Sequence, residues 1–152
     1  SIYNIKKKNL LNITNINLIG PTWLTSIVAA KMKKNKSGKI INISSIYGTV
    51  GKEKRSLYSI TKFGLNGLTK SSALDLAKFN VLVNSISPGV FNTKLTRKIL
   101  KKDGMKKVKL KIPLKKLGNP ESLANLCVFL CSNYNNYITG QNIIIDGGYT
   151  SY

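Results

Sequence analysis

Three residues in the middle of the chain are of types that can exchange a proton with a substrate. Tyr58 and Lys62 belong to the segment YSITK, and their spacing of four places both side chains on one face of a helix, one turn apart. An ammonium group near a phenol favours the phenolate and lowers the phenol's pKa from about 10, which suits general acid and base catalysis. The spacing alone is weak evidence, because Tyr-x-x-x-Lys also arises by chance in helices.

Ser45 strengthens the prediction because of its position. It follows the run KIINIS at residues 39–44 and precedes Tyr58 by thirteen positions. Such an apolar run is typical of a strand covered on both faces, and parallel sheets bind their ligands at the carboxyl ends of the strands. Serines after a strand also form ordinary turns. The downstream Tyr58 and Lys62 favour the functional interpretation.

The elements that must position these residues alternate between strands and helices. Short apolar runs predict strands at residues 39–44, 81–86 and 142–145, all of them central or well covered. Helical periodicity predicts helices at residues 12–34, 56–79 and 120–132. This alternation predicts an α/β fold, a Rossmann-like parallel sheet with helices on both faces. The lysine-rich region 93–117 has few apolar anchors and is predicted to be a mobile surface excursion.

Composition limits the classes of protein to which the chain can belong. Its 152 residues fit one domain, and no signal peptide or membrane-spanning run is recognisable, so we expect a cytoplasmic protein. Cys127 and Cys131 lie in an apolar helical segment and the chain has no histidine, which predicts reduced thiols and no metal site.

The net charge of +20 allows several interpretations. The lysines are spread along the chain, mostly without the neighbouring aromatic residues of a base-stacking surface, and asparagine and isoleucine are also abundant. This combined bias is typical of an AT-rich coding sequence, which we favour over a site for polyanions or for acidic substrates. A nucleic-acid partner is therefore not expected.

Four segments in order along the chain resemble the signatures of the short-chain dehydrogenase/reductase family. The resemblance runs from about Ile13 to Gly148. The segments are GKIINISSIYG, YSITKFGLNGLTKSSALDLA, VLVNSISPGVFNT and TGQNIIIDGG. This resemblance implies an oxidoreductase that transfers a hydride between NAD or NADP and a carbonyl/alcohol substrate.

The resemblance also implies a role for individual residues. Tyr58 would donate or accept the substrate's proton, and Ser45 would hydrogen-bond the reacting oxygen. Lys62 would lower the pKa of the tyrosine and, with Tyr58, contact the cofactor. Asn17 in the segment NINLIG would anchor a water behind the lysine, although other asparagines crowd this region.

The loop after the second predicted strand resembles the family's contact with the nicotinamide. Its residues are Pro88, Gly89, Val90 and Thr93. A glycine there permits close approach of a ligand to the backbone. Without the family context, an ordinary turn would explain this loop equally well.

Two family features are absent from these 152 residues: the glycine-rich turn TGxxxGxG and the NNAG-like segment. We therefore expect residues 1–152 to be a single partial domain, the C-terminal catalytic portion of a fold whose N-terminal half is missing. We also expect this fragment to bind dinucleotide poorly and to be inactive alone. The distinction between NAD and NADP is left open.

The overall pattern is similar to 3-oxoacyl carrier-protein reductases and to dehydrogenases of glycan or flagellin modification. Residues 46–57 and the region after Thr93 would set the substrate, but neither has a polar pattern that identifies a ligand. The two long helices are expected to form a homodimer or homotetramer in the full-length enzyme. The alternatives are a non-catalytic scaffold of the same fold and a basic nucleic-acid-binding protein, and the presence of Ser45, Tyr58 and Lys62 argues against the scaffold.

Overall fold

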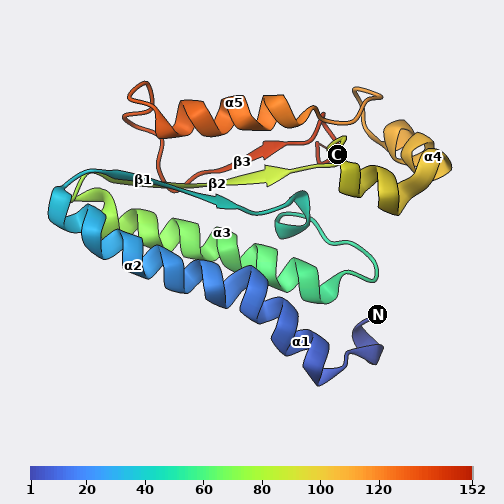
Figure 1. Cartoon of the computed structure of the whole chain (residues 1–152), viewed down its shortest axis with the longest axis horizontal. Coiled ribbons are helices and arrows are strands. Elements are labelled where there is room, and N and C mark those ends of the chain that lie inside the picture. The colour runs from blue at the N-terminus through green and yellow to red at the C-terminus, as the bar shows by residue number, and fades with distance from the viewer. Residues whose placement is uncertain (152) are drawn as a thin grey trace.

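A parallel sheet with helices on both faces forms the centre of the computed structural model, which describes residues 1–151 (Figure 1). Strands β1 (Gly38–Ile43), β2 (Val81–Pro88) and β3 (Asn142–Ile145) pair in the order β1-β2-β3. Both pairings are parallel, with Gly38 opposite Val81 and Ser85 opposite Asn142. The predicted α/β, Rossmann-like arrangement is confirmed.

The helices are divided between the two faces of the sheet. Helices α2 (Gly20–Asn35) and α3 (Ser56–Ala77) cover one face, and α5 (Pro120–Cys131) covers the other (Figure 1). Helix α1 (Lys7–Thr14) leads into α2, and α4 (Lys94–Lys111) lies beyond the end of the sheet. Two short 3-10 helices, η1 (Ile2–Asn4) and η3 (Ile46–Gly48), are also present among residues 1–151. No helix within residues 1–151 is long and apolar enough to cross a membrane.

The main hydrophobic core lies between the sheet and the helices α2 and α3. Its buried members are Ile40, Ala73, Leu76, Val81 and Val83. Strand β2 is the only one of the three that pairs on both sides, and its side chains Val81, Val83 and Ile86 are fully buried. The expectation that all three strands are central or well covered therefore holds for β2. In the outer strands β1 and β3, Ile43 and Ile144 are substantially exposed.

The predicted helix at residues 12–34 starts earlier and is interrupted. A π-helix, η2 (Asn15–Ile19), separates α1 from α2, and the backbone N–H of Gly20 bonds the carbonyl of Asn15, five residues earlier. The cause is Pro21, which has no N–H to donate to the carbonyl of Asn17, four residues earlier. The missing bond is compatible with the wider π turn, and π-helical turns are frequent at functional sites.

The surface excursion predicted at residues 93–117 is largely helical. Helix α4 occupies most of this region, and Thr93 caps it by accepting a hydrogen bond from the N–H of Thr96 at 3.1 Å. Lys101 has a positive φ of 52° and divides the helix at a kink. Lysine and leucine favour helix intrinsically, so α4 forms although no residue in it is buried. Its location on the surface agrees with the prediction.

Candidate active site

Tyr58 and Lys62 lie one turn apart on α3, as their spacing predicted. The Lys62 ammonium is 5.6 Å from the centre of the Tyr58 ring, within the range of a cation–π interaction. Lys62 Nζ also donates a hydrogen bond of 2.9 Å to the carbonyl oxygen of Ile43, at the end of β1. Partial burial lowers the pKa of Lys62 below its usual value of 10.5. The lysine therefore joins the helix to the carboxyl end of the strand.

Ser45 follows β1 directly and is buried, with only 7% of its surface exposed. Its backbone is extended, and its Oγ accepts a hydrogen bond of 3.2 Å from the N–H of Tyr47, which caps η3. Within residues 1–151, the Ser45 hydroxyl accepts one side-chain hydrogen bond and donates none. Its proton therefore has no acceptor among these residues. Ser45 can therefore donate a hydrogen bond to a ligand.

The loop between β1 and α3 is held against α3 by polar contacts. Ser44 Oγ donates to the carbonyl oxygen of Lys62 at 3.0 Å, and Asn66 Nδ2 donates to that of Gly48 at 2.9 Å. A Cβ on Gly48 would come within 2.8 Å of the Lys62 carbonyl oxygen, so only glycine allows this approach. These contacts fix the position of Ser45 relative to Tyr58.

A pocket of about 360 Å³ brings together most of the predicted site residues. Ser45 and Tyr58 line it from one side, and Pro88, Gly89 and Val90 line it from the loop after β2. The remaining lining residues are Tyr47, Arg55, Phe91, Thr96 and Leu123. Hydroxyl groups thus face a largely apolar wall formed by the β2 loop and its neighbours.

Thr93 occupies a position different from the one its predicted role suggests. It caps α4, and its hydroxyl lies 2.9 Å from that of Thr96. Thr96, and not Thr93, is among the residues that line the 360 Å³ pocket. The threonine that lines the pocket is therefore Thr96, which lies in the first turn of α4, three positions after Thr93.

Asn17 does not line this pocket. It is half-buried in the π-helix and lines a second hollow of about 620 Å³ together with Ile43 and Lys62. Asn4 and Asn9 instead line a pocket of about 260 Å³ beside Tyr58. Among the asparagines that crowd this region in sequence, Asn17 is thus the one that lines a hollow together with Lys62.

Tyr47 and Arg55 were not singled out from the sequence, but both line the pocket of Ser45 and Tyr58. Burial raises the pKa of Tyr47, and Tyr149 raises it further through its charge and a hydrogen bond. The positive charge of Arg55 acts in the opposite direction. Both residues lie within residues 46–57, the segment expected to set the substrate. Tyr47 and Arg55 reach the same pocket because of the path of the loop between β1 and α3. Their spacing in the sequence does not reveal that path.

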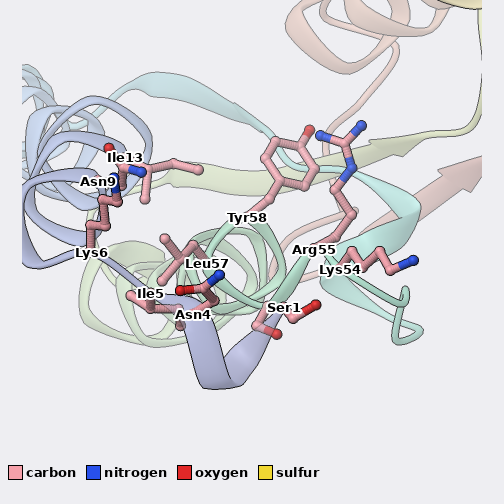
Figure 2. Close-up of a pocket in the computed structure, with 11 residues that line it drawn as sticks. Ser1, Asn4, Ile5, Lys6, Asn9, Ile13, Lys54, Arg55, Leu57 and Tyr58 are labelled. Carbon is pink, nitrogen blue, oxygen red and sulfur yellow. The ribbon is translucent and has the colours of Figure 1, made fainter.

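Figure 2 shows a neighbouring pocket of about 260 Å³ between the N-terminal segment and the start of α3. Tyr58 and Arg55 line this pocket as well, and their side chains extend in the same direction from the start of α3. Lys6 and Lys54 also contribute to its wall. The surroundings of Tyr58 are therefore positively charged.

Comparison with known proteins finds relatives along nearly the whole chain. The family model described as enoyl-(acyl carrier protein) reductase matches residues 1–150. The 3-oxoacyl-(acyl-carrier-protein) reductase of Aquifex aeolicus is 43% identical over 136 residues, which are 90% of this chain and 54% of the relative. The trans-4-hydroxycyclohexanecarboxylate dehydrogenase of Sinomonas cyclohexanicum is 40% identical over 136 residues, which are 90% of this chain and 50% of the relative.

Solved structures of the same fold superpose closely. ElxO with NADP bound has a TM-score of 0.93 at 32% identity, covering 99% of this chain and 61% of that structure. The 4-hydroxyisoleucine dehydrogenase complexed with NADH has a TM-score of 0.94 at 34% identity, covering 99% of this chain and 63% of that structure. The chain thus spans only part, about half to three fifths, of the length of these relatives.

Proposed function

The chain belongs to the short-chain dehydrogenase/reductase family, and from this premise we propose that it carries the proton-transfer centre of an oxidoreductase that interconverts a carbonyl and an alcohol. The observation that carries the proposal is the pocket shared by Ser45 and Tyr58, with Lys62 one helical turn behind the tyrosine. The names of the relatives refer to different substrates but agree on this reaction class.

Ser45 and Tyr58 act on the same substrate oxygen in this proposal. During reduction, the carbonyl carbon gains a hydride and the carbonyl oxygen gains a proton. The Tyr58 hydroxyl donates that proton, and the Ser45 hydroxyl donates a hydrogen bond that orients the oxygen. Ser45 is suited to this because its Oγ already accepts from Tyr47 and its own proton is free. Oxidation of the alcohol runs through the same groups in reverse.

Lys62 supports Tyr58 electrostatically. Its ammonium lies against the tyrosine ring and favours the phenolate that remains after proton donation. Its hydrogen bond to the Ile43 carbonyl uses one of its three donors, which leaves two for other partners. Asn17 anchors a water behind the lysine in this proposal, since Pro21 leaves the Asn17 carbonyl without its usual helical donor.

The residues around the pocket fit a nicotinamide cofactor, NAD or NADP. The apolar wall formed by Pro88, Val90 and the neighbouring Phe91 suits a flat ring, and the free donors of Lys62 suit ribose hydroxyls. A bound nicotinamide supplies or accepts the hydride. Solved relatives contain NADP or NADH, which supports this assignment. Pro88, Gly89, Val90, Tyr58 and Lys62 would hold the group, and Thr93 would act through its contact with Thr96.

Removal of the Tyr58 hydroxyl tests this function. In the complete natural polypeptide, Tyr58→Phe should lower the rate of NADH- or NADPH-dependent ketone reduction about 100- to 10,000-fold, because the proton donor is lost while the ring remains. Absorbance of the reduced cofactor measures the rate. The matched control is Tyr137→Phe, since Tyr137 is almost fully exposed and away from the site. A Tyr58→Phe rate equal to wild type would exclude the role assigned to the tyrosine.

A further inference from the structure

Arg55 is placed beside the reacting groups by the start of α3. It is the N-cap residue of that helix, three positions before Tyr58. Its side chain lines the 360 Å³ pocket together with Ser45 and Tyr58, and it also lines the adjoining 260 Å³ pocket with Tyr58 (Figure 2). The guanidinium group can therefore contact a molecule whose reactive oxygen lies at Ser45 and Tyr58.

The positive charge of Arg55 is not neutralised within residues 1–151. The one ion pair in this part of the chain joins the neighbouring residues Lys54 and Glu53 at the surface. The guanidinium of Arg55 takes part in none of the side-chain hydrogen bonds there, whereas that of Arg97 is bonded to Asn92 Oδ1 at 2.9 Å. None of the residues that line the 360 Å³ pocket is an aspartate or glutamate. The pocket thus contains a cation without an anionic partner.

The chemistry of this cation specifies what it can bind. A guanidinium presents five N–H donors in a planar fork that matches the two oxygens of a carboxylate. Besides Ser45 and Tyr58, the polar side chains of the pocket wall are Tyr47, Arg55 and Thr96, and of these only Arg55 is a cation. The apolar lining includes Val90, Phe91 and Leu123. A small molecule that carries a carbonyl and a carboxylate satisfies both ends of this arrangement.

We propose that Arg55 is a specificity-determining residue that binds the carboxylate of the substrate, so that the substrates of this site are oxo acids and the corresponding hydroxy acids. This inference rests on the proposed reaction at Ser45 and Tyr58 and adds the class of substrate to it. Arg55 acts by binding and orienting the substrate, and the proton transfer itself stays with Tyr58.

A comparison of acids with their esters tests the proposal in the complete natural polypeptide. The probes are 2-oxobutyrate, 3-oxobutyrate and 4-oxopentanoate, each paired with its methyl ester, because the ester removes the charge and keeps the ketone. Wild type should reduce at least one acid with a higher kcat/KM than its ester. Arg55→Gln should lower kcat/KM for that acid about 10- to 100-fold, mainly through KM, and leave the ester unchanged.

Two further variants make this test specific. Lys52→Gln removes a positive charge three residues away, at an exposed position outside the pocket, and should leave the preference for the acid unchanged. Arg55→Lys should restore part of the preference, because a lysine keeps the charge and loses the planar fork. Equal kcat/KM for each acid and its ester in wild type would overturn the proposal, as would an equal loss for acid and ester in Arg55→Gln.

Binding separates this proposal from the proposed function. Saturation-transfer NMR of 4-oxopentanoate and its methyl ester can be measured whether or not the protein is active. Absence of reduction with every ketone and both cofactors would contradict the oxidoreductase function. In that case, the carboxylate site would still be supported if Arg55→Gln abolishes binding of the acid and Tyr58→Phe retains it. The site would be overturned if acid and ester bind equally well with and without Arg55.

Discussion

The ammonium of Lys62 is half-buried between α3 and the end of β1, and this position determines the pH range over which it is charged. Burial disfavours the charged form, so the pKa of Lys62 is lowered and its proton is lost at a lower pH than that of an exposed lysine. The electrostatic support for Tyr58 should therefore disappear as the pH rises through the lowered pKa, below 10.5. The reduction rate should fall in the same range, as a pH profile of kcat/KM would measure.

The variant Lys62→Arg identifies the group responsible for this fall. A guanidinium remains charged throughout the alkaline range, so any residual activity of Lys62→Arg should lose the alkaline decline that wild type shows. If the decline persists unchanged in Lys62→Arg, it belongs to another group, and the role assigned to the lysine charge is contradicted.

At the level of single residues, the sequence predicts the reacting groups better than the groups around them. Tyr58 and Lys62 are recognisable because a helix fixes the relation of residues four apart, and Ser45 because strands end where ligands bind. Arg55 and Tyr47 meet the same pocket only through the path of an irregular loop, which has no period. Asn17 is distinguished from its neighbours by lining the 620 Å³ hollow together with Lys62, and the π-helix that holds it was not predicted from the sequence.

Among the elements, strands and amphipathic helices are predicted more reliably than segments shaped by one local contact. Strand β3 has the predicted bounds, and the predicted helix at residues 56–79 differs from α3 only at its end. The π-helix depends on the missing N–H of Pro21, and α4 depends on a cap at Thr93 and on intrinsic propensity. Neither of these causes changes the periodicity of apolar residues, which is the pattern used to predict helices and strands.

The loop after β2 is held against β3 by a close approach that only glycine permits. A Cβ on Gly89 would lie 2.7 Å from the Cβ of Asp146 and 2.8 Å from its Cα, and this backbone cannot move without disturbing the sheet. Gly89→Ala should therefore lower the free energy of unfolding by about 1–3 kcal/mol. The control is Gly51→Ala, because a Cβ there meets nothing within 4 Å, and it should change stability by less than about 0.5 kcal/mol. Urea unfolding measures both, and equal stability of the two variants would contradict this account.

On the scale of the whole molecule, positive charge and exposed apolar surface oppose one another. The net charge is +20, and the single ion pair among residues 1–151 neutralises little of it, so copies of the chain repel each other at low salt. An apolar stripe nevertheless runs along the π-helix and α2: Ile19, Trp23 and Ile27 recur every four residues and are 54%, 70% and 56% exposed. Phe63 on the neighbouring helix α3 is also 49% exposed. Surface of this kind is typical of a protein–protein contact.

We therefore expect a homodimer or homotetramer that associates through α2 and α3, and that is stabilised by salt because screening weakens the repulsion. Light scattering coupled to size exclusion should give a multiple of the monomer mass for the complete polypeptide, with a larger associated fraction at about 0.5 M than at about 0.05 M salt.

Trp23→Glu should shift the mass towards the monomer, since a carboxylate would be buried without a partner. Ile99→Glu, at an exposed position on α4, is the matched control and should leave the mass unchanged. A monomeric wild type at every concentration and salt, or an unchanged mass for Trp23→Glu, would contradict association through this stripe.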